Sequence, residues 1–173
     1  MSDFRADRFA SLYFVKPLRH LMVNRNQLRI PILMYHSISE SSQTGVHPYF
    51  AVETSPKVFE AQMKFLHDND YCTISPADVI ALLSSRQTDG KKYVVITFDD
   101  GYRDFYTYAF PILNRLGMSA TVYLPTAYIK QRSSPFNGKE CLTWAEVREL
   151  HRAGVQFGSH TVTHPKLTAL CHS

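Results

Sequence analysis

Several hallmarks of other protein classes are missing from this chain of 173 residues. It has three cysteines, far apart and without a Cys-x-x-Cys pair, which argues against a disulfide framework and against a structural zinc knuckle. No run of the sequence approaches the ~20 apolar residues of a transmembrane helix. We recognise no signal peptide, which favours a cytoplasmic location while leaving the localisation open. The length and an apolar content of 45% predict one globular domain.

An excess of charge is also missing from most of the chain. Residues 1–30 carry six lysines and arginines against two aspartates, which accounts for the whole net charge of +4. Residues 31–173 carry thirteen basic and thirteen acidic residues. Because nucleic-acid enzymes carry positive charge around the working site, this neutral body argues against nucleic acid as the partner. We expect residues 1–29 to form a basic N-terminal extension, either solvated or in peripheral contact with a membrane or a partner.

From residue 30 onward, short apolar runs alternate with helical patterns. We predict strands, the first of them buried, over residues 30–35, 71–74, 91–98, 119–124 and 155–157. Helices are predicted to begin after Ser55, Ser75 and Thr143, and a fourth covers residues 105–116, where Pro111 predicts a kink or a late start. The polar residues 130–140 predict a loop. This alternation predicts an α/β fold in which helical crossovers join parallel strands.

The first of two polar motifs is TFDDGY, residues 97–102, at the end of the strand predicted over residues 91–98. Successive side chains of a strand point to opposite faces, and a turn at Gly101 lets the carboxylates of Asp99 and Asp100 diverge. One carboxylate can then ligate a metal ion while the other serves as a base. The alternative interpretation is a simple turn, because Asp-Gly is a common turn pair.

The second motif is GSHTVTH, residues 158–164, at the end of the strand predicted over residues 155–157. His160 and His164 are four residues apart, a spacing that brings two rings together on a helical turn. Pro165 disfavours the α conformation at His164, so a tight loop has to bring the rings together instead. Imidazole suits zinc and similar metals. The alternative is that two of the eight histidines have this spacing by chance.

The two motifs together point to one site. The carboxyl ends of parallel strands meet at one edge of a sheet, where working residues gather. Asp100, His160 and His164 then form a two-histidine, one-carboxylate set with open positions for water and substrate, as in a metal-assisted hydrolase. Non-haem iron oxygenases use the same ligand set. However, they need no second aspartate, and they lie on antiparallel β-sandwich folds, which the predicted alternation contradicts.

The sequence resembles the polysaccharide deacetylase family, the NodB-homology domain of carbohydrate esterase family 4. TFDDGY is similar to the first motif of that family, and HTVTH is similar to the second. Three further stretches are similar, namely PILMYHS at residues 31–37, YLPTAYI at residues 123–129 and LTWAEV at residues 142–147. The resemblance runs from about residue 30 to residue 170. It implies an incomplete (β/α) barrel, in which residues 30–173 form a partial domain that lacks its C-terminal strands.

The resemblance also implies roles for individual residues. Asp99 is the catalytic base, and Asp100, His160 and His164 are the metal ligands, with zinc expected and cobalt, nickel or manganese as alternatives. The implied reaction is hydrolysis of the acetamide of N-acetylglucosamine units in a glycan such as chitin, peptidoglycan or exopolysaccharide. His36 and Tyr102 are candidate pocket-lining residues. The alternatives for them are a satisfied buried histidine and a packing aromatic residue.

Later motifs of that family are absent from this sequence. After the second motif, the family continues with an arginine–proline loop, an aspartate–tryptophan pair and a strand that ends in the general-acid histidine. No strand is predicted before His172, so it cannot replace that histidine. Since a general acid contributes typically 10²–10⁴-fold, we expect slow turnover, and we expect an open sheet edge that favours aggregation unless a partner covers it. The alternatives are a weakly active or inactive remnant that binds metal or glycan, and a metal-free interaction module.

Overall fold

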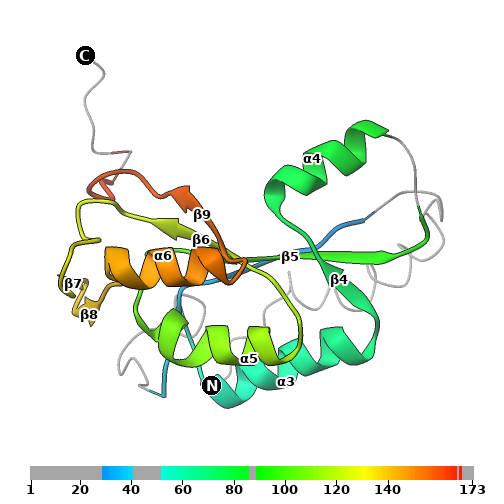
Figure 1. The fold of residues 1–173 in the computed structure, drawn as a ribbon, viewed down its shortest axis with the longest axis horizontal. Coiled ribbons are helices and arrows are strands. Elements are labelled where there is room, and N and C mark those ends of the chain that lie inside the picture. Colours follow the sequence, from blue (N-terminus) through cyan, green and yellow to red (C-terminus); the bar gives the residue numbers. More distant parts are fainter. Residues whose placement is uncertain (1–28, 41–51, 86–88, 167, 169–173) are drawn as a thin grey trace, which may run out of the picture.

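The described residues form a parallel β-sheet with helices packed against it (Figure 1). This computed structural model describes residues 29–40, 52–85, 89–166 and 168. The basic extension predicted over residues 1–29, apart from Arg29, and the C-terminal His172 lie outside the described part. Within that part, none of the helices has the length and apolar character that a bilayer crossing requires.

Strand β5 (Lys92–Phe98) runs through the centre of the sheet. It pairs in parallel with β1 (Ile32–Tyr35), β4 (Tyr71–Thr73) and β6 (Thr121–Leu124), and β6 pairs in parallel with β9 (Gln156–Ser159). Residues 94–98 of β5 are all buried, as expected for a continuous apolar strand in a parallel sheet. Because these strands all run in the same direction, their carboxyl ends meet at one edge of the sheet. The predicted parallel α/β arrangement is therefore confirmed.

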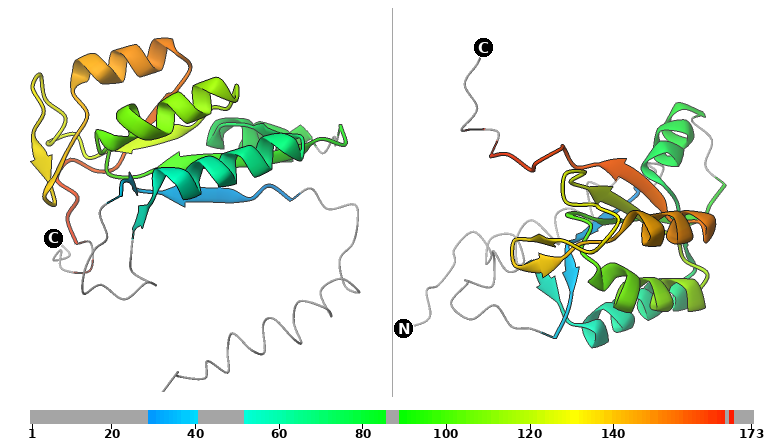
Figure 2. Two further views of the ribbon diagram at one scale, coloured as in Figure 1. Left: turned by 90° about the horizontal axis from the view of Figure 1, so that it is seen from below. Right: turned by 60° about the vertical axis from the view of Figure 1, so that its left-hand side comes forward.

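Three helices, α3 (Pro56–Asp68), α5 (Phe110–Arg115) and α6 (Trp144–Arg152), lie on one face of the sheet (Figure 2). Helix α3 begins as predicted, because the Ser55 hydroxyl accepts a hydrogen bond from the Val58 N–H (3.3 Å). Its apolar stripe is buried and consists of Phe59, Met63 and Leu66. Helix α6 begins after Thr143, as predicted, with a capping box between Thr143 and Glu146.

The helix predicted over residues 105–116 is divided into two parts. A π-helical segment, η2 (Phe105–Ala109), precedes α5, and the Phe110 N–H donates to the carbonyl of Phe105, five residues earlier. Pro111 has no N–H group, so the regular α-helical hydrogen bonds cannot continue through it. The predicted disturbance around Pro111 is confirmed, and it takes the form of a π-helical turn.

Helix α4 (Pro76–Ser85) differs from the other described helices because none of its residues is fully buried. Ile80 and Leu83 are 70% and 56% exposed. The prediction of a helix here is confirmed, but the helix lies apart from α3, α5 and α6 (Figure 1). Its apolar side chains therefore contribute little to the core.

The prediction that the first strand is buried is wrong. Ile32 and Met34 of β1 are 61% and 62% exposed, whereas Leu33 and Tyr35 pack against the core. Among the described residues β1 pairs with β5 alone, so no strand there covers its other edge. Between β1 and α3 runs an apolar groove of about 510 Å³, which is lined by Leu33, Tyr35, Val58, Ala61, Gln62, Phe65 and Leu66.

The prediction of a loop over residues 130–140 is also wrong in part, because this segment contains an antiparallel hairpin. Strands β7 (Pro135–Phe136) and β8 (Lys139–Glu140) pair around a turn at Asn137 and Gly138. A second short pair, formed by β2 (Ser37–Ile38) and β3 (Glu53–Thr54), follows β1 and is parallel.

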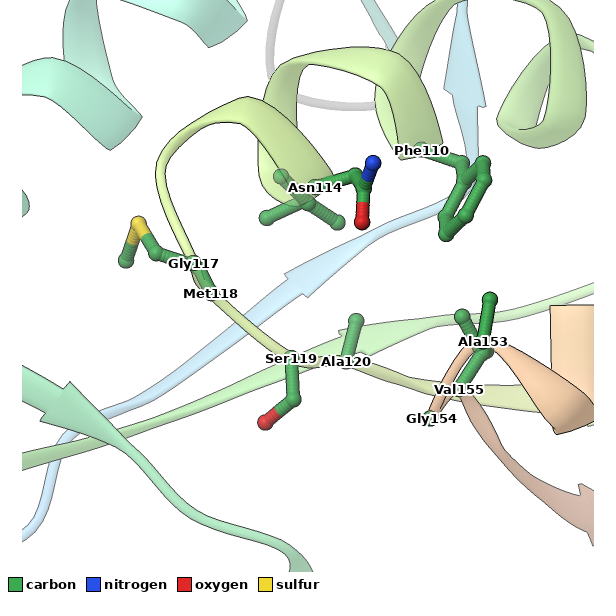
Figure 3. A pocket seen from close by; sticks show the side chains of 10 residues that line it. Phe110, Asn114, Gly117, Met118, Ser119, Ala120, Ala153, Gly154 and Val155 are labelled. Carbon is green, nitrogen blue, oxygen red and sulfur yellow. The ribbon is translucent and has the colours of Figure 1, made fainter.

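A cavity of about 240 Å³ lies between α5 and the turn that leads into β9 (Figure 3). Its lining includes Phe110 and Asn114 from α5, Ala120 before β6, and Val155 before β9. Ala120 and Val155 directly precede β6 and β9 and so stand at the amino ends of these strands. The two polar motifs follow the carboxyl ends of β5 and β9, so this cavity lies at the other edge of the sheet.

Candidate metal centre

Strand β5 delivers Asp99 and Asp100 to the carboxyl edge of the sheet. The Asp99 N–H donates to the Tyr35 carbonyl (2.9 Å), which extends the pairing with β1 by one residue. Asp100 and Gly101 then adopt left-handed conformations, with φ of 70° and 59°. A Cβ at position 101 would stand 2.7 Å from Leu124 Cδ2, so the turn requires glycine. As predicted, the turn separates the two carboxylates, since Asp100 is buried and Asp99 is partly exposed.

Strand β9 delivers the two histidines. The His160 N–H donates to the Leu124 carbonyl (2.9 Å), just beyond the paired ends of β6 and β9. Thr161 turns the chain with φ of 65°, and its hydroxyl accepts a hydrogen bond from the His164 N–H (2.9 Å). His164, which precedes Pro165, has φ of 52° and is therefore left-handed and not α-helical. The predicted tight loop is confirmed, because it brings the two ring centroids to 4.8 Å.

Three candidate ligand atoms converge at this edge. Asp100 Oδ1 lies 3.5 Å from Nε2 of His160 and 3.5 Å from Nε2 of His164, and the two Nε2 atoms are 3.1 Å apart. Ligands at about 2.0–2.1 Å around a tetrahedral ion stand about 3.3–3.4 Å from one another, so these residues fit a metal ion. Asp100 Oδ1 is also buried without a hydrogen-bond partner, which a cation would satisfy.

Asp99 stands beside these ligands, with its side chain 15% exposed. His36, the residue after β1, places Nε2 at 3.9 Å from Asp99 Oδ2 and has a side chain that is 22% exposed. This separation is too long for a direct hydrogen bond but suits an ion pair or a bridging water. The structure thus brings His36 and Asp99 together at neighbouring strand ends. The base role of Asp99 and the pocket-lining role of His36 stay predictions.

Tyr102 is buried next to Asp100, with 5% of its surface exposed. Burial raises the pKa of its hydroxyl, and the Asp100 carboxylate raises this pKa further, so the hydroxyl stays protonated. Tyr102 therefore packs beside Asp100 as a neutral side chain.

Cys141 is also buried near the site, and its Sγ lies 3.9 Å from the Asp100 carbonyl oxygen. Burial raises the pKa of the Cys141 thiol to about 11, and the neighbouring carboxylates of Asp100 and Asp104 add to this rise. The thiol is therefore protonated at neutral pH. Cys141 is fully buried and does not belong to the group of converging ligand atoms, so it serves as a packing residue.

Two structural supports of the site were not predicted. Arg103 follows the TFDDGY motif, and its Nε donates to Glu146 Oε1 (2.7 Å), which ties the turn after β5 to α6. The ring of Phe136, from the β7–β8 hairpin, packs edge-on against His164 with centroids 5.4 Å apart. The pair Asn137-Gly138 is the signal that could have revealed the hairpin, because this dipeptide favours two-residue hairpin turns. Nothing local marks Arg103 as the partner of Glu146.

Comparisons with known proteins point to one family. A family model described as polysaccharide deacetylase matches residues 86–173. The protein YxkH of Bacillus subtilis is 38% identical over 142 residues, which are 82% of this chain and 46% of YxkH. The poly-β-1,6-N-acetyl-D-glucosamine N-deacetylase of Escherichia coli K12 is 29% identical over 139 residues, 75% of this chain and 20% of that enzyme.

A solved structure supports the same assignment. The Streptococcus pyogenes deacetylase PplD, in complex with acetate, matches with a TM-score of 0.69 and 33% identity, over 82% of this chain and 60% of that chain. The predicted fold class, an incomplete (β/α) barrel of the NodB type, is thus confirmed. The chain spans about half of YxkH and a smaller share of the E. coli enzyme. Because the family model matches half of the sequence and places TFDDGY and HTVTH within it, the chain belongs to the polysaccharide deacetylase family.

Proposed function

We propose that this chain carries the metal-binding and proton-abstracting residues of a hydrolase that removes acetyl groups from N-acetylglucosamine units of a glycan. One observation carries the proposal: the ligand atoms of Asp100, His160 and His164 lie within 3.5 Å of one another, beside the second carboxylate of Asp99. Structural zinc sites use four protein ligands, whereas catalytic sites use three and keep one position open. Among the described residues three side chains converge on this point, a number that favours catalysis over a structural role.

The donor set indicates which ions to test. Two imidazole nitrogens and one carboxylate oxygen suit zinc, with cobalt, nickel and manganese as alternatives. A divalent ion held by these atoms would supply Lewis-acid chemistry, which acidifies water and polarises a carbonyl oxygen. The chain contributes the orientation, because Asp100 Oδ1 already lies 3.5 Å from Nε2 of His160 and 3.5 Å from Nε2 of His164.

Asp99 is the residue that moves the proton. Its carboxylate takes a proton from the water that adds to the acetamide carbon. The carbon–nitrogen bond then breaks, and the nitrogen takes up a proton and leaves as the amine of a glucosamine unit, while the acetyl group leaves as acetate. His36 lines the site beside this carboxylate, with Nε2 at 3.9 Å from Asp99 Oδ2.

The relatives suggest the substrate class. The E. coli and Staphylococcus aureus relatives, 29% and 25% identical, are named poly-β-1,6-N-acetyl-D-glucosamine N-deacetylases. That name describes those enzymes. For this chain it makes β-1,6-linked N-acetylglucosamine oligomers the first substrates to test, followed by oligomers from chitin and peptidoglycan.

The test is acetate release from these oligomers by the purified chain loaded with zinc. Asp99→Asn should lower the rate by about 10²–10⁴-fold, because it removes the base. The same variant should bind zinc as the wild type does, since Asp99 is not one of the three ligands. His67→Ala, in an exposed residue of α3, is the control and should change neither quantity.

The outcomes separate the candidate functions. Zinc binding without acetate release from any oligomer would contradict the hydrolase and support a remnant that binds metal or glycan without turnover. Failure of the wild-type chain to bind zinc, cobalt, nickel or manganese would contradict the metal centre itself.

A further inference from the structure

The β7–β8 hairpin takes no part in the proposed reaction, yet it contacts the site closely. Its turn residues Asn137 and Gly138 have φ of 49° and 78°, the left-handed pair of a two-residue hairpin turn. Phe136 and Lys139 are directly paired across this turn, so their side chains lie on the same face. Phe136 is 7% exposed, and the Lys139 side chain is 24% exposed, so both side chains face the protein.

The first contact supports His164. The Phe136 ring meets the imidazole edge to face, with centroids 5.4 Å apart and planes at 62°. Phe136 is itself held by the rings of Tyr128, at 4.4 Å, and Tyr102, at 6.1 Å. His164 is the most exposed of the three ligands, with 41% of its side chain accessible. A fixed aromatic neighbour therefore limits the motion of the ligand that has the most freedom.

The second contact reaches the neighbourhood of Asp100 through Tyr102. The Phe136 and Tyr102 rings stack, with centroids 6.1 Å apart and planes at 22°. Tyr102 is buried, and it follows Asp100 by two residues in the turn after β5. The hairpin therefore contacts one ligand directly and the turn that carries a second ligand through Tyr102.

Lys139 fastens this hairpin to β2 and β3. Its Nζ lies 2.5 Å from Glu53 Oε1, and it donates to the hydroxyls of Ser37 (2.8 Å) and Ser39 (3.2 Å). The Ser37 hydroxyl in turn donates to Asp104 Oδ2 (2.5 Å). The Glu53 side chain is 8% exposed, so solvent screens this ion pair far less than a surface pair. The anchor therefore depends strongly on the positive charge of Lys139.

We propose that Lys139 is a positioning residue, which holds the β7–β8 hairpin against His164 and Tyr102 and thereby preorganises the three ligand atoms for a divalent metal ion. This inference rests on the metal centre of the proposed function. The contacts of Lys139 described above are with β2 and β3, so its effect on the ligands passes through the hairpin. Outer partners of metal ligands typically change metal affinity by about 10–100-fold.

The experiment measures the dissociation constant of zinc for the purified chain by competition with a chromophoric chelator. It also records the visible spectrum of the cobalt-loaded chain, which reports ligand geometry. Lys139→Met should raise the dissociation constant about tenfold or more and alter the cobalt spectrum. Lys139→Arg keeps the charge beside Glu53 and should restore most of the affinity. Lys130→Met, in an exposed lysine of the preceding loop, is the matched control and should keep the wild-type affinity.

Two further variants keep the inference open to contradiction if Lys139→Met does not fold. Lys139→Met combined with Glu53→Gln removes both charges of the anchor, and Phe136→Leu removes the ring from His164 while it preserves the anchor. Circular dichroism shows which variants are folded, and each folded one should bind zinc more weakly. Wild-type affinity in a folded variant that lacks Lys139 would overturn this inference alone. A wild-type chain without zinc affinity would overturn the metal centre and this inference with it.

Discussion

His160 and His164 hold their Nε2 atoms 3.1 Å apart across a loop that is not helical. Two ring nitrogens at this distance need a shared proton or a cation between them, because their lone pairs otherwise repel each other. The backbone enforces the approach, since Thr161 is left-handed and its carbonyl accepts a hydrogen bond from the Thr126 N–H (3.2 Å). The loop is therefore built to bring the two rings together.

Removal of one of these rings should abolish tight metal binding. We expect His160→Ala to raise the dissociation constant of zinc by about a hundredfold or more, because one of three ligands is lost. Thermal unfolding gives a second measure. Zinc at a hundredfold excess over its dissociation constant should stabilise the wild type by about 2.7 kcal/mol and should stabilise the variant far less. His151→Ala, in an exposed residue of α6, should behave as the wild type does. Equal stabilisation of His160→Ala by zinc would exclude His160 as a ligand.

The strands that deliver the ligands could be predicted because their signals are local. The apolar run that forms β5 is buried on both faces, and the polar residues that follow it mark where the strand leaves the sheet. Parallel pairing then places the motifs after β5 and β9 at one edge. The convergence of Asp100, His160 and His164 follows from this topology, although their separations do not.

Other parts depend on partners that are distant in the sequence. The apolar residues of β1 predict burial, but burial requires a covering element, and Met34 is 62% exposed in the described structure. The β7–β8 hairpin has strands of two residues, too short to show alternation, so only its Asn-Gly pair was readable. The link between Lys139 and Glu53 joins residues 86 positions apart, which no local pattern reveals.

Gly158, two residues before His160, should not tolerate a side chain. A Cβ there would stand 2.6 Å from the Tyr123 ring, so either the ring or strand β9 would have to move. We expect Gly158→Ala to lower the free energy of unfolding by about 1–3 kcal/mol, the usual cost of overpacking. Zinc affinity should fall as well, because β9 places His160.

Urea denaturation measures the change in stability of Gly158→Ala, and chelator competition measures the change in zinc affinity. Ser159→Ala, in an exposed residue, is the control. Wild-type values for Gly158→Ala would mean that the Tyr123 ring yields freely.

Truncation of two phenylalanines of α3 should change the free energy of unfolding by very different amounts. Phe59 is fully buried, and Phe59→Ala should lower the free energy of unfolding by about 3–5 kcal/mol. Phe65 is 62% exposed beside β1, and Phe65→Ala should change stability by less than about 0.5 kcal/mol. Since exposed apolar groups beside a strand edge promote association, Phe65→Ala should also reduce light scattering at high protein concentration. Scattering equal to that of the wild type would show that this groove takes no part in self-association.

Glu146 couples the stability of the fold to pH. Its side chain is 11% exposed and accepts hydrogen bonds from Arg103 Nε (2.7 Å) and from the N–H of Thr143 (2.8 Å). Burial by itself raises the pKa of Glu146, but the hydrogen bonds from Thr143 and Arg103 outweigh it and hold the pKa below the ordinary value of 4.5. The unfolded chain therefore binds this proton more readily than the folded chain does. It follows that this source of stability is present above about pH 4.5 and is lost as the pH falls through the folded-state pKa.

Glu146→Gln tests this linkage. At pH 7 the variant should be less stable than the wild type by about 1.5–3 kcal/mol, because hydrogen bonds to a charged acceptor are replaced by bonds to a neutral amide. The difference should shrink as the pH is lowered from 7 to 3, since the wild type loses the same charge by protonation. Urea denaturation in the presence of a chelator measures both chains at each pH. Burial raises the pKa of Asp104, but that carboxyl is present in both chains and its effect largely cancels in the difference.

The control for this prediction is Arg148→Gln, in an exposed residue of α6 that stays charged over this range. Its stability difference from the wild type should be independent of pH. A difference for Glu146→Gln that stays constant down to pH 3 would mean that the Glu146 carboxylate contributes by packing and not by its charge.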